Sequence, residues 1–158
     1  MNNNHINESG DLHMVDISEK ETTVREAIAK GCIYLNNHAF SSVVELNNKK
    51  GDVLNVARIA GINAVKQASS LIPLAHNILI DTVKVDFSLD ESECKIHSTV
   101  TVKAEGKTGV EIESLVGVQI SLMTIYDMCK YLDRTMIIND VKLMTKTGGK
   151  SGDFIREK

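Results

Sequence analysis

The chain has 158 residues, of which 42% are hydrophobic and 25% are charged, and its formal net charge is −3 at pH 7. This size and composition predict a single globular domain over residues 1–158. The acidic balance disfavours a general nucleic-acid binder, and no apolar run reaches the roughly eighteen residues of a membrane span. The three cysteines form no CxxC pair and no secretory signal is visible, so we expect a cytoplasmic protein.

The beginning of the chain is polar and predicts an irregular N-terminal arm over residues 1–20, with residues 14–18 (MVDIS) as a candidate short strand. Thr23 and Glu26 have the spacing of a capping box, so a short helix is expected to run to Lys30. Residues 32–35 form a short β-type run, and residues 39–46 a weak helical segment.

The middle of the chain carries stronger signals. Asp52 is a good N-cap for a helix over residues 53–69, which Pro73 would bring to an end. Residues 78–89 and 94–104 each alternate between apolar and polar side chains. Alternation of this kind is typical of strands with one buried face, so we expect a long antiparallel hairpin.

The stretch from Glu105 to Arg134 predicts the central helix of the fold. It opens with a Gly-Lys-Thr-Gly turn, and its apolar residues cover more than half of the helical circumference. A final strand over residues 136–144 and a flexible glycine-rich tail over residues 147–158 follow. The order β-α-β-β-α-β predicts an α+β, ferredoxin-like fold, in which helices cover one face of a four-stranded antiparallel sheet.

Charged residues at the two ends of this helix are candidate functional groups, because a mostly buried helix tolerates charge only beside water, a partner or a ligand. Glu111 and Glu113 lie at its start, and Asp127 and Lys130 near its end. By itself the last pair would be a helix salt bridge worth ~0.3 kcal/mol. His76, in the apolar run LIPLAHN, could equally be a satisfied core or turn residue.

Two familiar nucleotide-binding patterns are not supported. The TGGKS sequence near Lys150 resembles part of a P-loop, but Met144 stands where the first glycine is required and too few residues remain for the following helix. A glycine-rich backbone beside lysines could still wrap an anion, or be a plain polar tail. The βαββαβ order also describes RNA-binding domains, but the strand over residues 95–103 lacks the aromatic residues that stack on bases.

Several strings follow one another in the order and spacing of one family. They are HINESGDLHMVDIS, KGDVLNVARIAGINAVK, LIPLAHN, GKTGVEIESL, SLMTIYDMCK and KTGGKSGDF. On these motifs the chain resembles the cyclic pyranopterin monophosphate synthase family of molybdenum cofactor biosynthesis, protein C of that pathway. The resemblance covers His5 to Phe154, and YDMCK together with GGKSGDF is highly specific.

The resemblance implies an enzyme, a lyase. Its substrate would be the cyclic dihydro-GTP intermediate (3′,8-cyclo-7,8-dihydroguanosine 5′-triphosphate), and its products cyclic pyranopterin monophosphate and pyrophosphate. It also implies a ferredoxin-like fold and a hexamer built as a trimer of dimers, with active sites between subunits. No protein-bound metal is expected, although Mg²⁺ could arrive with the triphosphate. Nucleic acid and membranes are not expected partners.

The resemblance also assigns roles to individual residues. Asp127, Lys130 and Lys50 take the catalytic positions. Where the family usually has Cys-His-Pro, this chain has Ala75-His76-Asn77, and the usual Glu-Met-Glu is Glu-Ile-Glu here. The positions expected to contact the substrate or shape the pocket are Leu74, Ala75, His76, Glu111, Ile112, Glu113, Arg25, Lys66, Lys146 and Lys150.

These residue types suit the reaction. Cations would bind the triphosphate and stabilise the departing pyrophosphate. Lys50 or Lys130 would act as acid and base, with Asp127 orienting Lys130 or accepting a proton itself. A rival hypothesis is a non-catalytic, nucleotide-binding oligomeric regulatory module, in which the helix charges would form salt bridges between subunits.

Overall fold

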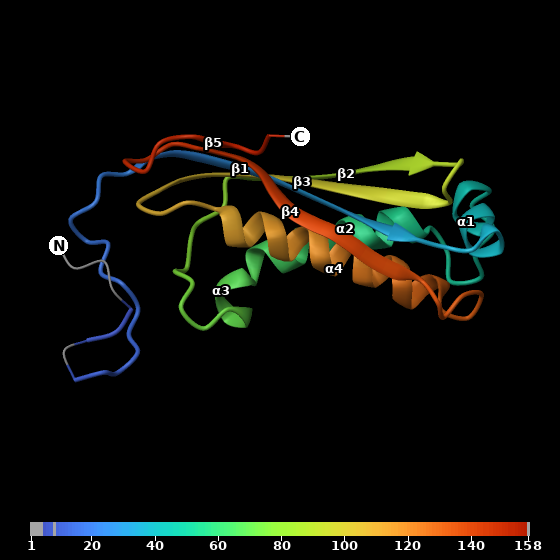
Figure 1. Cartoon of the computed structure of the whole chain (residues 1–158), viewed down its shortest axis with the longest axis horizontal. Coiled ribbons are helices and arrows are strands. Elements are labelled where there is room, and N and C mark those ends of the chain that lie inside the picture. The colour runs from blue at the N-terminus through green and yellow to red at the C-terminus, as the bar shows by residue number, and fades with distance from the viewer. Residues whose placement is uncertain (1–4, 8, 158) are drawn as a thin grey trace.

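The computed structural model describes residues 5–7 and 9–157, and within them it consists of one antiparallel sheet with helices packed against it (Figure 1). The sheet has the strand order β2-β3-β1-β4-β5. The α+β class with an antiparallel sheet is therefore confirmed, but the sheet has five strands instead of the predicted four. The strands are β1 (Thr23–Tyr34), β2 (Thr82–Asp90), β3 (Lys95–Gly106), β4 (Ile137–Thr147) and β5 (Phe154–Ile155).

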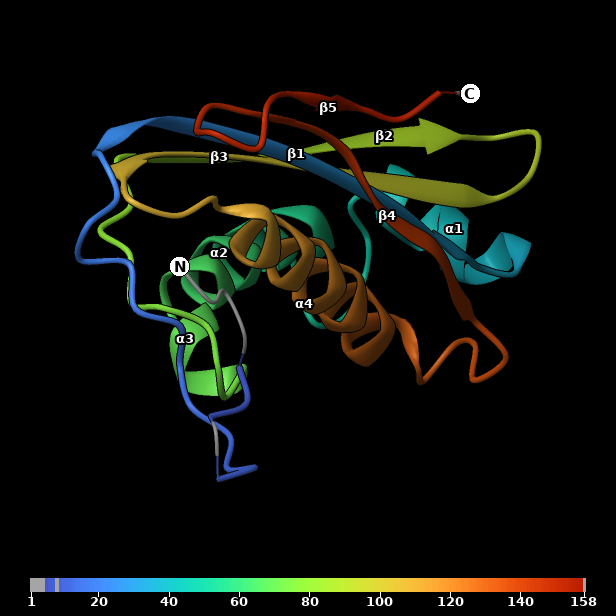
Figure 2. The ribbon, with the colours of Figure 1, turned by 60° about the vertical axis from the view of Figure 1, so that its left-hand side comes forward.

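Helices α1 (Asn37–Val44), α2 (Val53–Lys66), α3 (Ala68–Leu71) and α4 (Glu111–Cys129) complete the fold. Figures 1 and 2 show α2 and α4 side by side beneath the sheet. Their backbones approach closely because both contribute glycine at the crossing, where a Cβ added to Gly61 would lie 3.2 Å from the carbonyl oxygen of Gly117. The predicted N-cap is confirmed, since the Asp52 carboxylate accepts a hydrogen bond from the Asn55 N–H at 3.0 Å.

The central strand β1 is where the sequence prediction is wrong. Residues 23–30 are not a helix, and residues 14–18 are not a strand. β1 pairs with β3 along its whole length and with β4 on its other edge, and these pairings outweigh the local helix propensity. Glu26 does not close a capping box; its carboxylate instead lies 2.7 Å from the ammonium of Lys103, its partner across the strands.

The buried face of β1 carries small side chains because α4 lies directly against it. Ala27 and Ala29 are fully buried, and a Cβ added to Gly31 would come within 3.0 Å of side-chain atoms of Val118 and Leu122. The predicted β2–β3 hairpin is confirmed, with bounds shifted by a few residues. Its inward-facing side chains and those of β1 and α4 form one continuous core.

The helix α4 is largely buried, as its apolar surface predicted, but one strip of it remains open to solvent in the single chain. Leu122 and Ile125 are completely buried, whereas Met123 is 57% exposed. No helix in residues 5–7 and 9–157 combines the length and apolarity needed to cross a membrane.

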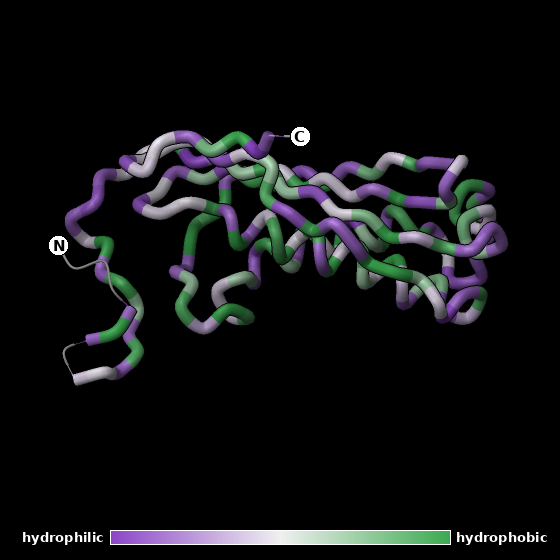
Figure 3. The backbone as a smooth tube through the Cα atoms, in the orientation of Figure 1, coloured by the Kyte–Doolittle hydropathy of each residue, from purple (hydrophilic) through white to green (hydrophobic). Residues whose placement is uncertain are grey.

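The N-terminal arm and the turn between β4 and β5 both lie at the end of the sheet where α4 begins. The N-terminal arm runs past that end of the sheet and extends beyond it on the helix side (Figure 1). The segment between α3 and β2, a mostly hydrophobic stretch of the tube in Figure 3, lies beside the arm. The predicted glycine-rich tail contains ordered structure: after the turn at residues 148–153, β5 pairs with β4, and the Arg156 N–H donates to the Met144 carbonyl at 2.8 Å.

Candidate active site

Apart from Lys66, the predicted site residues gather at the two ends of α4. Glu111 and Glu113 face two adjoining cavities at its start, whereas Asp127 lies sixteen positions after Glu111. At 1.5 Å per residue the two ends are about 24 Å apart along the helix axis.

The first cavity, called here the His76 cavity, has a volume of about 320 Å³ and lies between the N-terminal arm and the start of α4. Six predicted residues come from LIPLAHN and the beginning of α4, and all of them except Glu111 line this cavity. The arm supplies the opposite wall, which the sequence prediction missed. The lining residues from the prediction are Leu74, Ala75, His76, Ile112 and Glu113, and those from the arm are His5, Val15, Ile17 and Lys20.

His76 fastens the arm to the body of the protein. Its Nε2 lies 2.8 Å from the carbonyl oxygen of Val15. Because a carbonyl only accepts hydrogen bonds, Nε2 must carry the proton, which leaves Nδ1 as an acceptor in the neutral ring. His76 therefore has one nitrogen committed to the arm and one available to a ligand.

Glu113 supplies a carboxyl group to the His76 cavity and is buried, at 4% exposure. Burial raises its pKa above the ordinary value of 4.5, and the nearby Glu111 carboxylate raises it further. A carboxyl group that keeps its proton to a higher pH can donate a hydrogen bond as well as accept one.

The second cavity, called here the cation cavity, is larger, at about 580 Å³, and shares Lys20, Thr108 and Gly109 with the His76 cavity. Four predicted residues line it: Arg25, Glu111, Lys146 and Lys150. The sequence prediction missed Lys20, in the N-terminal arm, and Lys107. The Gly-Lys-Thr-Gly turn directly before α4 was the signal that could have revealed Lys107.

The charges in the cation cavity are only partly balanced. The Lys146 ammonium lies 3.1 Å from the Glu111 carboxylate. Arg25, although just 9% exposed, donates through Nε to the carbonyl of Gly106 at 3.2 Å, and Lys107 donates to the carbonyl of Ser18 at 2.5 Å. Within the described residues neither has a carboxylate within 4.0 Å. The cavity thus keeps positive charge for an anion.

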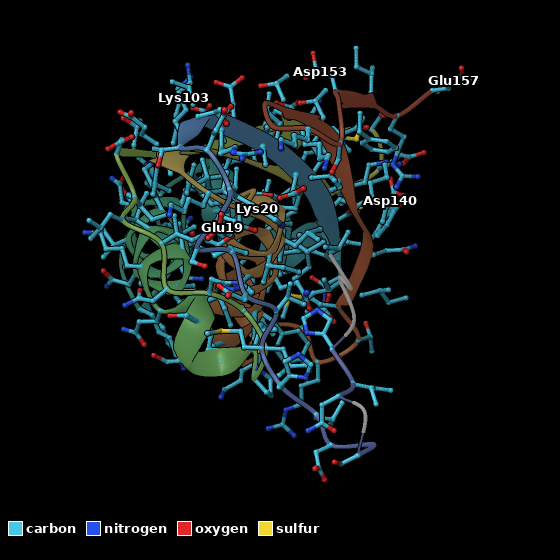
Figure 4. The ribbon with its side chains drawn as sticks, turned by 90° about the vertical axis from the view of Figure 1, so that its left-hand side faces the viewer. Glu19, Lys20, Lys103, Asp140, Asp153 and Glu157 are labelled. Carbon is cyan, nitrogen blue, oxygen red and sulfur yellow. The ribbon has the colours of Figure 1, made fainter. Side chains whose placement is uncertain are left out.

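The glycine loop covers residues 147–153, and its first five residues, 147–151, form one wall of the cation cavity. Gly149 has a φ of +84°, and a Cβ at this position would lie 1.6 Å from Nη1 of Arg25. The loop is closed by Asp153, whose carboxylate accepts a hydrogen bond from the Gly148 N–H at 3.2 Å. Figure 4 looks onto this end of the molecule, with Lys20 and Asp153 labelled. Only glycine gives the Arg25 guanidinium room at this point.

At the far end of α4, Asp127 holds two lysines, a group called here the Asp127 cluster. Its Oδ1 lies 2.7 Å from Lys130 Nζ, and its Oδ2 lies 3.2 Å from Lys50 Nζ. Lys50 Nζ also donates to the backbone carbonyl of Asp127 at 2.7 Å. The hydrogen bonds from Lys130 and then from Lys50 lower the pKa of Asp127, so it is a carboxylate at neutral pH.

One predicted residue stands apart. Lys66 lies exposed at the end of α2 and lines neither the His76 cavity nor the cation cavity. In the single chain the structure brings together nine of the ten predicted substrate contacts around one end of α4. It brings the three predicted catalytic residues together at the other end.

Comparisons with known proteins identify a family for this chain. A family model described as the MoaC family matches residues 14–149. A relative from Peptoclostridium acidaminophilum is 48% identical over 97% of this chain and 96% of its own length. Another from Thermoanaerobacter pseudethanolicus is 49% identical over 99% of both chains, and one from Clostridium acetobutylicum is 47% identical over 96% and 94%. All three are named cyclic pyranopterin monophosphate synthase.

Proposed function

This chain belongs to the MoaC family, and we propose that it catalyses the reaction that the name of its relatives describes, the synthesis of cyclic pyranopterin monophosphate. It is a lyase of molybdenum cofactor biosynthesis. The proposed substrate is cyclic dihydro-GTP, with pyrophosphate as the second product. The observation that carries this proposal is the pair of adjoining cavities, one with histidine and glutamate and one with cations.

The two cavities suit the two halves of such a substrate. The guanine-derived rings present hydrogen-bond donors and acceptors, which match His76 and Glu113. The triphosphate carries the negative charge, which matches Arg25, Lys107 and Lys150 in the neighbouring cavity. Cations that hold a triphosphate also stabilise the charge that develops as pyrophosphate leaves when the cyclic phosphate closes.

The Asp127 cluster is proposed to move the protons of the ring rearrangement. Since Asp127 is a carboxylate at neutral pH, its proposed role is to hold Lys50 and Lys130 in place. A lysine can then deliver a proton to one atom of the substrate and remove one from another.

The separation of about 24 Å between the two ends of α4 favours a site shared between subunits. One small substrate cannot contact Glu113 and Asp127 of the same chain. The proposed assembly is a hexamer, a trimer of dimers, in which the start of α4 in one subunit faces the end of α4 in another. The exposed strip of α4 that includes Met123 is available for such contacts.

The remaining features of the proposal follow from the family resemblance. The first four strands and the two long helices support a ferredoxin-like arrangement, to which β5 adds a fifth strand. The proposed reaction needs no resident metal, and Mg²⁺ would enter with the triphosphate. We place the enzyme in the cytoplasm, with no nucleic-acid or membrane partner. Lys66 would serve the substrate only from a neighbouring subunit.

The experiment that tests the proposal measures product formation and pyrophosphate release from cyclic dihydro-GTP. Lys50→Ala, Asp127→Ala and Lys130→Ala are each expected to lose at least about a hundredfold in turnover, because each removes a member of the proton-transfer group. Lys84→Ala is the matched control, since Lys84 is an exposed lysine of β2 that pairs with Asp86. Near-normal turnover in all three cluster variants would contradict the assigned roles.

The non-catalytic alternative, a nucleotide-binding regulatory module, is not favoured, because the relatives bear the name of an enzyme. The same assay separates the two, since a regulatory module would bind the nucleotide without releasing pyrophosphate.

A further inference from the structure

Lys50 is held in place although it lies on a loop. Residues 47–51 connect α1 to α2 without helix or strand, between Leu46 at a φ of +54° and Gly51 at a φ of +96°. Fixing a long lysine side chain on such a loop costs conformational entropy in both backbone and side chain. Its contacts with Asp127 therefore require that the backbone beside it be anchored.

Asn48 provides the first anchor. It is 6% exposed, and its Oδ1 accepts a hydrogen bond from the Lys50 N–H at 2.9 Å. Its Nδ2 donates to the hydroxyl of Ser42 in α1 at 3.3 Å and lies 3.7 Å from the sulfur of Cys129 in α4. One buried amide thus connects the Lys50 backbone to two helices, at a point two residues from Asp127.

Tyr131 provides the second anchor, from the residue that follows Lys130. Its hydroxyl oxygen accepts a hydrogen bond from the Lys49 N–H at 3.1 Å, and the Lys49 ammonium lies 3.9 Å from the centre of its ring. A cation at this distance from an aromatic face is attracted to it. The backbone N–H groups of two successive residues are therefore both fixed to the end of α4.

We propose that Asn48 and Tyr131 are positioning residues that together set the contact between Lys50 and Asp127. Neither side chain touches the Lys50 ammonium; both act through the backbone of residues 49 and 50. This inference rests on the proposed function, because an effect on kcat requires Lys50 to be a catalytic residue. The geometric effect does not depend on that role.

The test compares Asn48→Ala and Tyr131→Phe with Asn47→Ala. Asn47 is a suitable control, because within the described part of the chain its exposed side chain donates only to Glu45. For the two anchor variants we expect kcat to fall about tenfold and KM to change less than about twofold, since a displacement near 1 Å is enough to weaken catalysis strongly. A loss of that kind, with a normal melting temperature, separates positioning from general stability.

A second readout follows Lys50 itself. Acetylation by an N-hydroxysuccinimide ester, quantified for each lysine by mass spectrometry, should be at least about threefold faster at Lys50 in the anchor variants, because a side chain released from its contacts with Asp127 is more accessible to the reagent. Lys84 provides the internal reference. If Asn48→Ala does not fold, Tyr131→Phe carries the test, since it removes one hydroxyl from a partly exposed residue.

Unchanged Lys50 acetylation and unchanged kcat in the folded anchor variants would overturn the inference. The failure of the proposed function has a different signature. In that case Lys50→Ala would keep its turnover, while acetylation of Lys50 would still rise in the anchor variants.

Discussion

Replacing Gly149 with alanine should force Arg25 out of its place in the cation cavity. The new Cβ would lie 1.6 Å from Nη1 of Arg25, whereas ordinary contact begins at 3.4 Å. The guanidinium must therefore move by about 1.8 Å, which breaks or weakens its hydrogen bond to the Gly106 carbonyl, now 3.2 Å long. Gly149 also has a φ of +84°, so alanine adds backbone strain of about 1–2 kcal/mol.

The effect on catalysis follows from the value of one charged contact. A hydrogen bond to an ionised group contributes about 1.5–3 kcal/mol, which corresponds to a loss of about 10- to 160-fold in kcat/KM. Most of that loss should appear as a higher KM if Arg25 binds the triphosphate equally in the ground state and the transition state. Binding of inorganic pyrophosphate, measured by calorimetry, should weaken in parallel.

Gly152→Ala is the matched control, because Gly152 lies in the same loop at a φ of +71° but has no atom within 4 Å of an added Cβ. Both variants should lose similar stability in thermal unfolding, since both acquire the same kind of backbone strain. Only Gly149→Ala should lose pyrophosphate affinity. Equal losses of affinity in the two variants, or wild-type affinity in Gly149→Ala, would show that the glycine does not make room for Arg25.

Three further predictions concern stability. Leu122→Ala should lower the free energy of unfolding by about 2–5 kcal/mol in denaturant titrations, because Leu122 is fully buried, whereas Met123→Ala should cost far less in the single chain. Asn36→Ala should cost about 1 kcal/mol by the same measurement, since the Asn36 side chain caps α1 by accepting from the Ala39 N–H at 2.8 Å. Because the pKa of Glu113 is raised on folding, the folded protein keeps the Glu113 proton to a higher pH than the unfolded chain does. The stability contributed by the protonated Glu113 is therefore complete below about pH 4.5 and is lost as the pH rises through the pKa of the folded protein. Glu113→Gln should remove that loss, so melting temperatures measured between pH 4 and 8 should diverge in favour of the variant as the pH rises; parallel curves would contradict the assignment.

The sequence predicted those parts of the fold whose signal is local. The alternation in β2 and β3 and the N-cap at Asp52 were sufficient to place the hairpin and α2. β1 was missed because Glu26, Ala27 and Lys30 favour helix, and the neighbouring sequence contains no signal for the strands that pair with β1. Those partners, β3 and β4, lie some 70 and more than 100 residues further on, and only their edges make residues 23–34 a strand.

The candidate site also contains residues that local spacing could predict and residues that it could not. Spacing alone could pair Asp127 with Lys130, because these residues share a helix face. Lys50 is 77 positions from Asp127 and entered the prediction only through the family resemblance. Lys107 was missed because its turn was interpreted as a helix start and nothing more. Asn48 and Tyr131 carry no motif, so their hydrogen bonds to the Lys50 loop could be found only in three dimensions.

The central position of β1 also determines how late in synthesis the sheet of this protein can form. β1 ends at Tyr34, but the strand that closes its second edge ends at Thr147, 113 residues later. At a translation rate of about 5–20 residues per second, that edge stays open for roughly 6–23 s on the ribosome. An open strand edge beside apolar side chains is a template for pairing with other chains. The nascent polypeptide must therefore be kept from its neighbours until its last long strand has emerged, and only then can the catalytic scaffold close.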